Sequence, residues 1–197
     1  MEATTPLASP VVVKIGGSLY DLPDLEPRLT RWLTQMKDTP VLLVPGGGKI
    51  ADAVRELDRI HRLGEDRAHW LALQVMAVQA RFLMTMVPGV VVVEQLEACA
   101  KVWRYARHAI LDAHAFAQAD EGKEGALPHS WTVTSDSIAA RAARLLNARK
   151  LVLLKSVDWP CEANWEEAAR AGVVDAWFPR VVGDLSVGVL NFRRAPG

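Results

Sequence analysis

Val11-Val12-Val13-Lys14-Ile15-Gly16-Gly17-Ser18 is the stretch that decides the fold, a hydrophobic run that closes on two glycines. A second run of the same kind follows, Val41-Leu42-Leu43-Val44-Pro45-Gly46-Gly47-Gly48-Lys49. Short β-branched runs that end at glycine predict buried strands, and consecutive glycines let the backbone come close to a bulky anion. Each turn leads toward a helix, whose N-terminal N–H groups attract negative charge. Two such turns, each beside a lysine, predict a protein that holds phosphate groups between two strand ends.

Further strands and helices alternate along the rest of the chain. Short apolar runs predict four more strands, at residues 90–93, 108–111, 151–154 and 187–192. Apolar residues at helical spacing predict helices over residues 24–36, 50–60, 65–86, 94–102, 135–147 and 164–171. This alternation indicates an α/β protein whose mainly parallel sheet carries helices on both faces. Ligands of such sheets bind at the carboxyl ends of the strands, where both glycine turns lie.

The composition is that of an ordinary globular protein. The 197 residues are 50% hydrophobic and 23% charged, with a formal net charge of zero, whereas a general nucleic-acid binder is normally basic. No apolar stretch reaches the roughly 18 residues of a transmembrane helix, and the first residues lack a signal-peptide pattern. We therefore expect a cytoplasmic protein with no nucleic-acid or membrane partner. We expect a flexible leader at residues 1–10 and one domain over residues 11–197.

Neither the cysteines nor the histidines form a metal-binding pattern. Cys99 and Cys161 lie outside any CxxC motif, so we expect two reduced thiols. The histidines show neither HExxH nor CxxC-plus-His spacing. We therefore expect no metal ion held by protein ligands.

Several common phosphate-binding motifs are absent from the sequence. Residues 46–50 do not supply the GxxxxGK[ST] of a P-loop. Ala51 stands where the dinucleotide fingerprint GxGxxG needs its last glycine. There is also no GxSxG elbow and no protein-kinase signature. The glycine turns therefore need another explanation.

Three charged residues in unusual positions are the candidate catalytic groups. Lys14 interrupts one apolar run, and Lys155 closes another, Leu151–Leu154. Asp136 lies in the first turn of its helix, where it is either a simple cap or a carboxylate that orients the two lysines or an Mg²⁺ ion. Phosphoryl transfer needs positive charge and N–H donors around the transferred group rather than covalent chemistry. These residues therefore favour phosphoryl transfer.

Four segments together resemble the amino acid kinase superfamily, the fold of acetylglutamate, aspartate and uridylate kinases. They occur in the family's order and at about its spacing, over residues 11–160. The segments are Lys14-Ile15-Gly16-Gly17-Ser18, Pro45-Gly46-Gly47-Gly48-Lys49, Thr134-Ser135-Asp136-Ser137-Ile138-Ala139-Ala140 and Leu153-Leu154-Lys155-Ser156-Val157-Asp158. The resemblance implies a three-layer αβα sandwich that binds ATP as phosphoryl donor, with Mg²⁺ carried by the ATP.

The resemblance also implies a role for each part of the chain. Residues 11–135 would bind the acceptor and residues 136–197 the nucleotide. Lys14 would stabilise the moving phosphoryl group and Asp136 would organise the site, with Lys155 as the third catalytic residue. The residues expected to bind ATP or its phosphates are Lys14, Gly16, Gly17, Ser18, Lys155, Ser156, Val157 and Asp158.

Residues 127–137 resemble one branch of the superfamily more closely, that of the kinase in methanofuran biosynthesis. This branch transfers phosphate to (5-(aminomethyl)furan-3-yl)methyl phosphate and gives a diphosphate, in one-carbon metabolism. His129 is either an acceptor-pocket residue or a loop histidine, and Trp131 either stacks on a furan ring or belongs to the core. The candidate acceptor-binding residues are Gly46, Gly47, Gly48, Lys49, Arg55, His129, Trp131 and Ser135.

Two alternatives remain at this level. The chain is either another kinase of the superfamily, of uridylate or acetylglutamate type, or a non-catalytic member that binds nucleotide or oxyanion. The second alternative follows from residues 161–179, which contain no lysine where family members often place a phosphate-binding one. The superfamily forms dimers and hexamers, and the broadly apolar helix at residues 65–86 is the expected interface of a homo-oligomer.

Overall fold

The computed structural model describes residues 9–105, 107–159 and 164–194. Within them six strands form one parallel sheet in the order β3-β4-β2-β1-β5-β6. The strands are β1 (Val11–Ile15), β2 (Val41–Pro45), β3 (Val90–Val93), β4 (His108–Leu111), β5 (Lys150–Lys155) and β6 (Val187–Asn191). Because every pair is parallel, the carboxyl ends of all six strands lie at one edge of the sheet.

Helical segments connect the strands, as the alternating pattern predicted. They are η1 (Gly17–Asp21), α1 (Leu25–Gln35), α2 (Gly48–His61), α3 (Glu65–Met86), η2 (Leu96–Ala98), α4 (Cys99–Arg104), α5 (Ala113–Asp120), α6 (Ser135–Leu145), α7 (Trp165–Arg170) and α8 (Phe178–Val182). The predicted bounds of α3 are confirmed. Two short helices, α5 and α8, were not predicted, and the helix expected at residues 94–102 is a 3₁₀ turn followed by α4.

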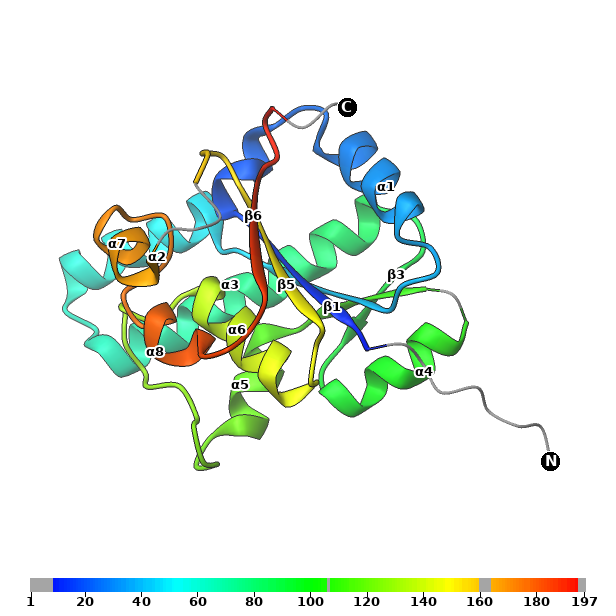
Figure 1. Cartoon of the computed structure of the whole chain (residues 1–197). Helices are drawn as coiled ribbons and strands as arrows, with labels where there is room; N and C mark the ends of the chain where they lie inside the picture. Colours follow the sequence, from blue (N-terminus) through cyan, green and yellow to red (C-terminus); the bar gives the residue numbers. More distant parts are fainter. Residues whose placement is uncertain (1–8, 106, 160–163, 195–197) are drawn as a thin grey trace.

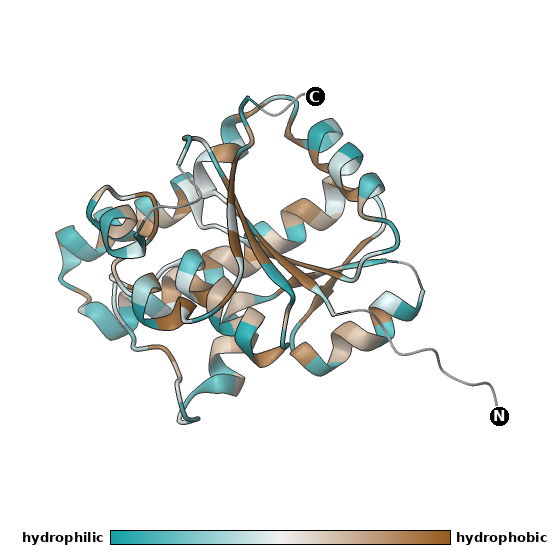
Figure 2. Cartoon of the chain, in the orientation of Figure 1, coloured by the Kyte–Doolittle hydropathy of each residue, from teal (hydrophilic) through white to brown (hydrophobic). Residues whose placement is uncertain are grey.

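Helices cover both faces of the sheet, so the three-layer αβα sandwich is confirmed. Figure 1 shows α6, α7 and α8 on one side of β5 and β6, and α1 on the other. The long helix α3 contributes to the cores on both sides. The strands are the most continuously hydrophobic segments of the chain (Figure 2), as expected for a sheet that is buried on both faces.

The alternation of side chains along β1 determines where its lysine points. Val11, Val13 and Ile15 pack in the core on the α1 side, whereas Val12 packs in the core on the α6 side. Because successive side chains point to opposite faces, Lys14 shares the α6 face with Val12. The strand therefore directs this lysine toward the start of α6.

The structure adds one local feature and corrects one expectation. Asp24 precedes α1, but its side chain makes no capping hydrogen bond and instead pairs with Arg28 at 2.6 Å. Pro10, expected in the flexible leader, is buried, and its carbonyl accepts a hydrogen bond from the Arg149 N–H. The rest of the expected leader, residues 1–8, and Cys161 lie outside the described residues.

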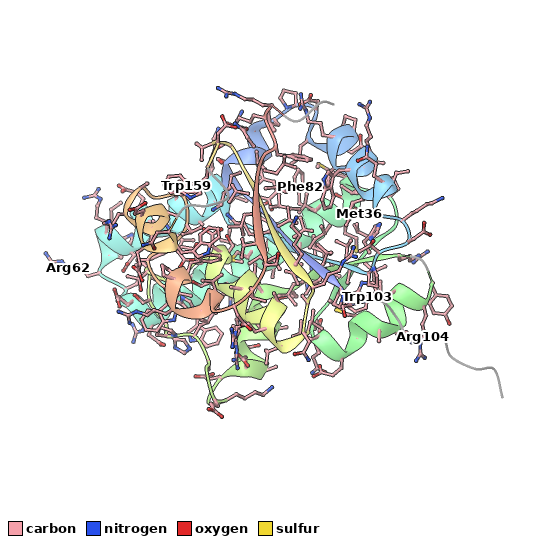
Figure 3. The ribbon with its side chains drawn as sticks, in the orientation of Figure 1. Met36, Arg62, Phe82, Trp103, Arg104 and Trp159 are labelled. Atoms are coloured by element: carbon pink, nitrogen blue, oxygen red, sulfur yellow. The ribbon has the colours of Figure 1, made fainter. Side chains whose placement is uncertain are left out.

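The apolar stripe of α2 is mostly exposed, although its spacing is that of a core-facing helix. Val54 is buried, but Ile50, Leu57 and Ile60 are 45%, 48% and 54% exposed. Helix α3 also exposes apolar side chains, Val78 and Phe82 among them, and Phe82 is labelled in Figure 3. None of the helices in the described part of the chain combines the length and apolar character needed to cross a membrane.

Candidate active site

The two glycine turns lie directly against each other at the carboxyl edge of the sheet. The Gly46 N–H donates to the carbonyl of Ile15 at 2.9 Å. A methyl group on Gly17 would lie 2.7 Å from the Cα of Gly48, and one on Gly46 would lie 2.6 Å from the amide nitrogen of Gly17. Only glycine allows the two backbones to come this close. The pairing of the two turns therefore explains why both are rich in glycine.

A buried cluster of three charged side chains lies beside these turns. Asp136 is in the first turn of α6, and its Oδ1 is 3.0 Å from the Nζ of Lys14. The Nζ of Lys155 donates to both carboxylate oxygens of Asp136, at 2.7 and 2.9 Å. All three residues are less than 9% exposed. The structure thus brings together the three residues that the sequence predicted as the catalytic set.

The charges in this cluster perturb one another. Burial alone would raise the pKa of Asp136, but the ammonium groups of Lys14 and Lys155 outweigh it, so that the pKa lies below its ordinary value. Burial and the charge of Lys14 lower the pKa of Lys155 to about 8, although Asp136 opposes them. At neutral pH the cluster therefore holds two cations and one anion in a volume shielded from water.

A second carboxylate, that of Asp175, holds the start of α6. Its Oδ2 accepts hydrogen bonds from the Thr134 N–H, the Thr134 hydroxyl and the Ser137 N–H, each at 2.9 Å. Its Oδ1 accepts from the Ser137 hydroxyl at 2.5 Å and from the N–H groups of Trp177 and Phe178. Thr134 is the N-cap of α6 but makes no side-chain cap bond of its own. Asp175 supplies that cap from 38 to 41 residues away.

Residues after β5 and β6 meet the first glycine turn. The Ser18 hydroxyl donates to the Ser156 hydroxyl at 2.9 Å. Arg193 donates to the carbonyl of Ser18 at 2.7 Å and pairs with Asp21. The predicted nucleotide-binding residues of this region are at the surface: Val157 is 46% exposed, and Asp158 pairs with Arg194 at 2.6 Å.

A cavity of about 250 Å³ opens beside the paired turns, and Ser18 of the first turn also lines it. Gly17, Gly47, Gly48 and Ser135 contribute to one part of its wall. Apolar side chains of α3 and α6 (Leu73, Met76 and Ile138) form the body of the cavity. The cavity therefore joins a region rich in backbone N–H groups to an apolar chamber, which suits a small molecule with one anionic end.

Arg55 and Trp131 close one side of this cavity. The Arg55 guanidinium carbon lies 4.8 Å above the Trp131 ring centroid, and Arg55 also pairs with Asp52 at 2.9 Å. The Trp131 indole N–H donates to Asp58 at 2.9 Å. Trp131 therefore lines the cavity with one ring face already covered by a cation.

Three predicted acceptor-binding residues lie outside the wall of this cavity. Gly46 is buried, and its N–H is bonded to the carbonyl of Ile15. Lys49 is exposed and lines a neighbouring hollow with Tyr20 and Phe82. His129 lines an adjacent cavity, where it bonds Asp66 at 2.6 Å and stacks on His69, with ring centroids 5.3 Å apart. His69 lines both cavities and separates His129 from the acceptor chamber.

Within residues 9–105, 107–159 and 164–194, no group of three or more His, Cys, Asp and Glu side chains is placed to hold a metal ion. Both oxygens of Asp136 face lysine ammonium groups. The carboxylate thus pairs with both lysines, as the alternative in which it orients them requires.

A model of the amino acid kinase family matches residues 9–159, which contain every predicted site residue. The chain belongs to the amino acid kinase family. Among curated relatives, the [5-(aminomethyl)furan-3-yl]methyl phosphate kinase of Methanocaldococcus jannaschii is 27% identical over 148 residues. These residues are 75% of this chain and 66% of that enzyme, so the match spans slightly less than two thirds of the relative's length.

Solved structures of the family share the fold at low sequence identity. The uridylate kinase of Archaeoglobus fulgidus is 16% identical, with a TM-score of 0.69 over 93% of this chain and 90% of that one. The UMP kinase of Bacillus anthracis is 15% identical, with a TM-score of 0.69 over 96% and 90% of the two chains. The UMP kinase of Ureaplasma parvum is 16% identical, with a TM-score of 0.68 over 94% of this chain and 91% of that one. At this identity the likeness establishes the architecture alone.

Three residues at or near the site of this amino acid kinase family member were not predicted. Asp175 and Arg193 lie beyond the family match, and His69 carries no motif. Only Asp175 had a sequence signal: an aspartate followed by Trp177-Phe178-Pro179 is typical of a helix start, with proline in the first turn. Burial and the neighbouring His129 lower the pKa of His69, so its ring is neutral at pH 7.

Proposed function

We propose that this chain is an ATP-dependent kinase that phosphorylates a small, phosphorylated acceptor. The buried cluster of Lys14, Asp136 and Lys155 beside the paired glycine turns is the observation that carries this proposal. Phosphoryl transfer requires preorganised positive charge where the transferred group develops negative charge. Two lysines held by one carboxylate provide a net positive site, and the backbone at Gly17 provides an N–H donor beside it. The Gly16 N–H, which the sequence also predicted as a phosphate donor, is bonded to the carbonyl of Leu154 at 2.8 Å.

In the proposed reaction an oxygen of the acceptor phosphate attacks the γ-phosphorus of ATP. A new P–O bond forms, the bond from the γ-phosphorus to the β,γ-bridging oxygen breaks, and ADP leaves. Lys14 neutralises the transferred group, and Asp136 fixes both lysines. Mg²⁺ supplies further neutralisation of the ATP phosphates. No carboxylate cluster of the described residues offers it a ready set of protein ligands, so we assign it to the nucleotide.

The two reactants would bind on opposite sides of the paired glycine turns. We place ATP on the side of Ser18, Lys155, Ser156, Val157 and Asp158. We place the acceptor in the cavity lined by Gly47, Gly48, Arg55, Trp131 and Ser135. The backbone at Gly47 and the helix that starts at Gly48 would orient N–H groups toward the acceptor phosphate, whereas the Gly46 N–H is already bonded to the carbonyl of Ile15. Lys49 and His129 lie next to this cavity, and we assign them at most an electrostatic effect on the acceptor.

The acceptor that we favour is (5-(aminomethyl)furan-3-yl)methyl phosphate, which would become its diphosphate in methanofuran-type cofactor biosynthesis. The support is the archaeal relative, whose name states this substrate, at 27% identity. A small apolar chamber with a polar, N–H-rich end is compatible with a furan that carries one phosphate.

The second candidate function is a uridylate kinase. Its support is the TM-score of 0.69 to a uridylate kinase over most of both chains. Proteins of one fold can use many different acceptors. The support for a uridylate kinase is therefore weaker than the support for the substrate named in the sequence relative. An acceptor carboxylate, as in acetylglutamate kinases, would use the same cluster.

A direct phosphotransfer assay tests these candidates. Purified protein is incubated with Mg²⁺-ATP and, separately, the aminomethylfuran phosphate, UMP and N-acetylglutamate, and ADP release is measured. ³¹P NMR then identifies the product, because a diphosphate shows two coupled phosphorus signals and an acyl phosphate shows one. We expect turnover with the furan phosphate. If the protein binds Mg²⁺-ATP but releases no ADP in the presence of any of these acceptors, the result would instead indicate the non-catalytic alternative.

A further inference from the structure

We propose that Asp175 is a positioning residue of the kinase site, which holds Asp136 where it can bridge Lys14 and Lys155. The inference rests on the proposed phosphoryl transfer. It concerns a residue beyond the family match, and it makes the segment before α8 part of the catalytic apparatus.

Asp175 forms hydrogen bonds with residues on both sides of Asp136 in the sequence. They reach Thr134, two residues before Asp136, and Ser137, the residue after it. The first turn of a helix is normally fixed by its own N-cap side chain, but the Thr134 hydroxyl is used to donate to Asp175. The orientation of the turn that carries Asp136 therefore depends on Asp175.

The other end of the same carboxylate is fixed by the core. Asp175 accepts from the N–H groups of Trp177 and Phe178 at 3.1 and 2.9 Å. Phe178 is fully buried in the core on the α6 side, and its ring packs edge-on against Trp165 at 5.2 Å. Asp175 thus connects the start of α6 to an anchored segment, and a displaced Asp175 would displace Asp136.

The position of Asp175 is electrostatically unfavourable, which argues for a role. Burial and the nearby charge of Asp136 raise the pKa of Asp175, even though hydrogen bonds to Ser137 and Thr134 lower it. An uncharged side chain that accepts hydrogen bonds would avoid the repulsion between Asp175 and Asp136. A carboxylate offers both oxygens as acceptors, three hydrogen bonds on each, and an amide offers only one oxygen.

Asp175→Asn is the direct test. The amide nitrogen must face either the N–H groups of α6 or those that precede α8, so one of the two attachments is lost. Displacement of a catalytic group by about 1 Å can lower the rate on the order of 100-fold, so we expect a 10- to 100-fold fall in kcat and a smaller change in KM for ATP.

A pH measurement separates positioning from general destabilisation. The charged groups that face Lys155 are Lys14 from β1 and Asp136 from α6, and only Asp136 favours its protonated form. If Asp136 moves away, the pKa of Lys155 falls further. We therefore expect the basic limb of kcat/KM to move to lower pH by about one unit in Asp175→Asn. ¹³C-lysine NMR of the free protein should show the same shift for the Lys155 signal, assigned with Lys155→Arg.

Asp120→Asn is the matched control. Asp120 is also a buried carboxylate that holds α6, through two bonds to Arg141 at 2.9 and 3.0 Å, but it lies away from the first turn of the helix. We expect this variant to lower stability without moving the pH limb or the NMR signal. If Asp175→Asn does not fold, the milder Thr134→Val removes one of the same bonds and should give a smaller shift in the same direction.

The outcomes are distinguishable. A fall in kcat with an unchanged pH limb and an unchanged Lys155 signal would overturn the proposal, since Asp175 would then be merely structural. A shifted Lys155 signal in a protein that phosphorylates no acceptor would support the positioning role and reject the proposed function. Equal shifts in Asp175→Asn and Asp120→Asn would also overturn the proposal.

Discussion

Replacing Asp136 with asparagine removes the carboxylate that Lys14 and Lys155 share. Asparagine keeps the shape of the side chain but not its charge, so two buried ammonium groups face each other without an anion. Removal of one partner from a buried ion pair destabilises proteins by about 3–5 kcal/mol, and we expect a loss in this range at pH 7. Without the fixed lysines, kcat should fall on the order of 100-fold or more.

Part of that stability loss should depend on pH in a defined way. A lysine whose pKa is lowered by folding binds more protons in the unfolded state, so stability rises with pH between its folded pKa and its ordinary value of 10.5. In the native protein this rise begins near pH 8, the pKa of Lys155. In Asp136→Asn only burial and Lys14 act on Lys155, both of which lower its pKa, so the rise begins at lower pH.

The size of the effect follows from the same pKa. If the variant's Lys155 is neutral at pH 7, the variant gains about 1.4 kcal/mol between pH 7 and 8 while the native protein gains little. The stability gap between the two proteins therefore narrows by about 1 kcal/mol between pH 7 and 8 and by a further ~0.3 kcal/mol between pH 8 and 9.

Urea unfolding at pH 7, 8 and 9 measures this gap without any requirement for enzyme activity. Asp120→Asn is again the control, because its partner Arg141 does not titrate in this range, so its stability loss should be the same at each pH. A gap for Asp136→Asn that does not change between pH 7 and 8 would refute the reasoning. So would a variant as stable as the native protein.

Three other substitutions test the site and the surface. For the native enzyme we expect kcat/KM to fall above about pH 8, where Lys155 loses its proton. In Lys155→Arg the guanidinium stays charged at all accessible pH, so this fall should be absent when each profile is normalised to its own maximum. Gly17→Ala places a methyl group against the backbone of Gly48 and should lower kcat/KM at least tenfold, whereas Gly188→Ala meets only the mobile end of Lys150 and should change it little. Phe82→Asp charges the exposed apolar face of α3 and should reduce the mass measured by light scattering to that of a monomer; Tyr105→Asp, at another exposed aromatic, should not. A monomeric native protein would contradict the expected interface.

The parts of this fold that the sequence predicted depend on local patterns. A strand buried on both faces has a continuous apolar run, and β1, β2 and β5 all have one. Lys14 and Lys155 were detectable because a cation in such a run is anomalous. Their meeting at Asp136 was one of the alternatives that the sequence left open for that residue, and the parallel register of β1 and β5 brings it about.

The parts that were missed depend on contacts between distant residues. The sequence marks Asp175 only as the start of a helix, and its contact with Thr134, 41 residues earlier, is a result of the fold. Helical spacing in α2 correctly predicted a helix but not its environment, since Ile50 and Leu57 are exposed. An apolar stripe has the same period whether it faces the core of its own chain or a partner, so periodicity cannot separate the two.

The contacts of the two lysines indicate how the site divides its work between them. Lys155 donates to both oxygens of Asp136, at 2.7 and 2.9 Å, whereas Lys14 approaches one oxygen at 3.0 Å. An ammonium group has three donors, so Lys14 keeps more of its hydrogen-bonding capacity for a phosphoryl oxygen. Lys155 mainly balances the carboxylate, so the charge of Lys14 is less compensated than that of Lys155. Because Lys155 on β5 already supplies a second positive charge, less positive charge is needed from residues 161–179. This is consistent with the absence of lysine from those residues.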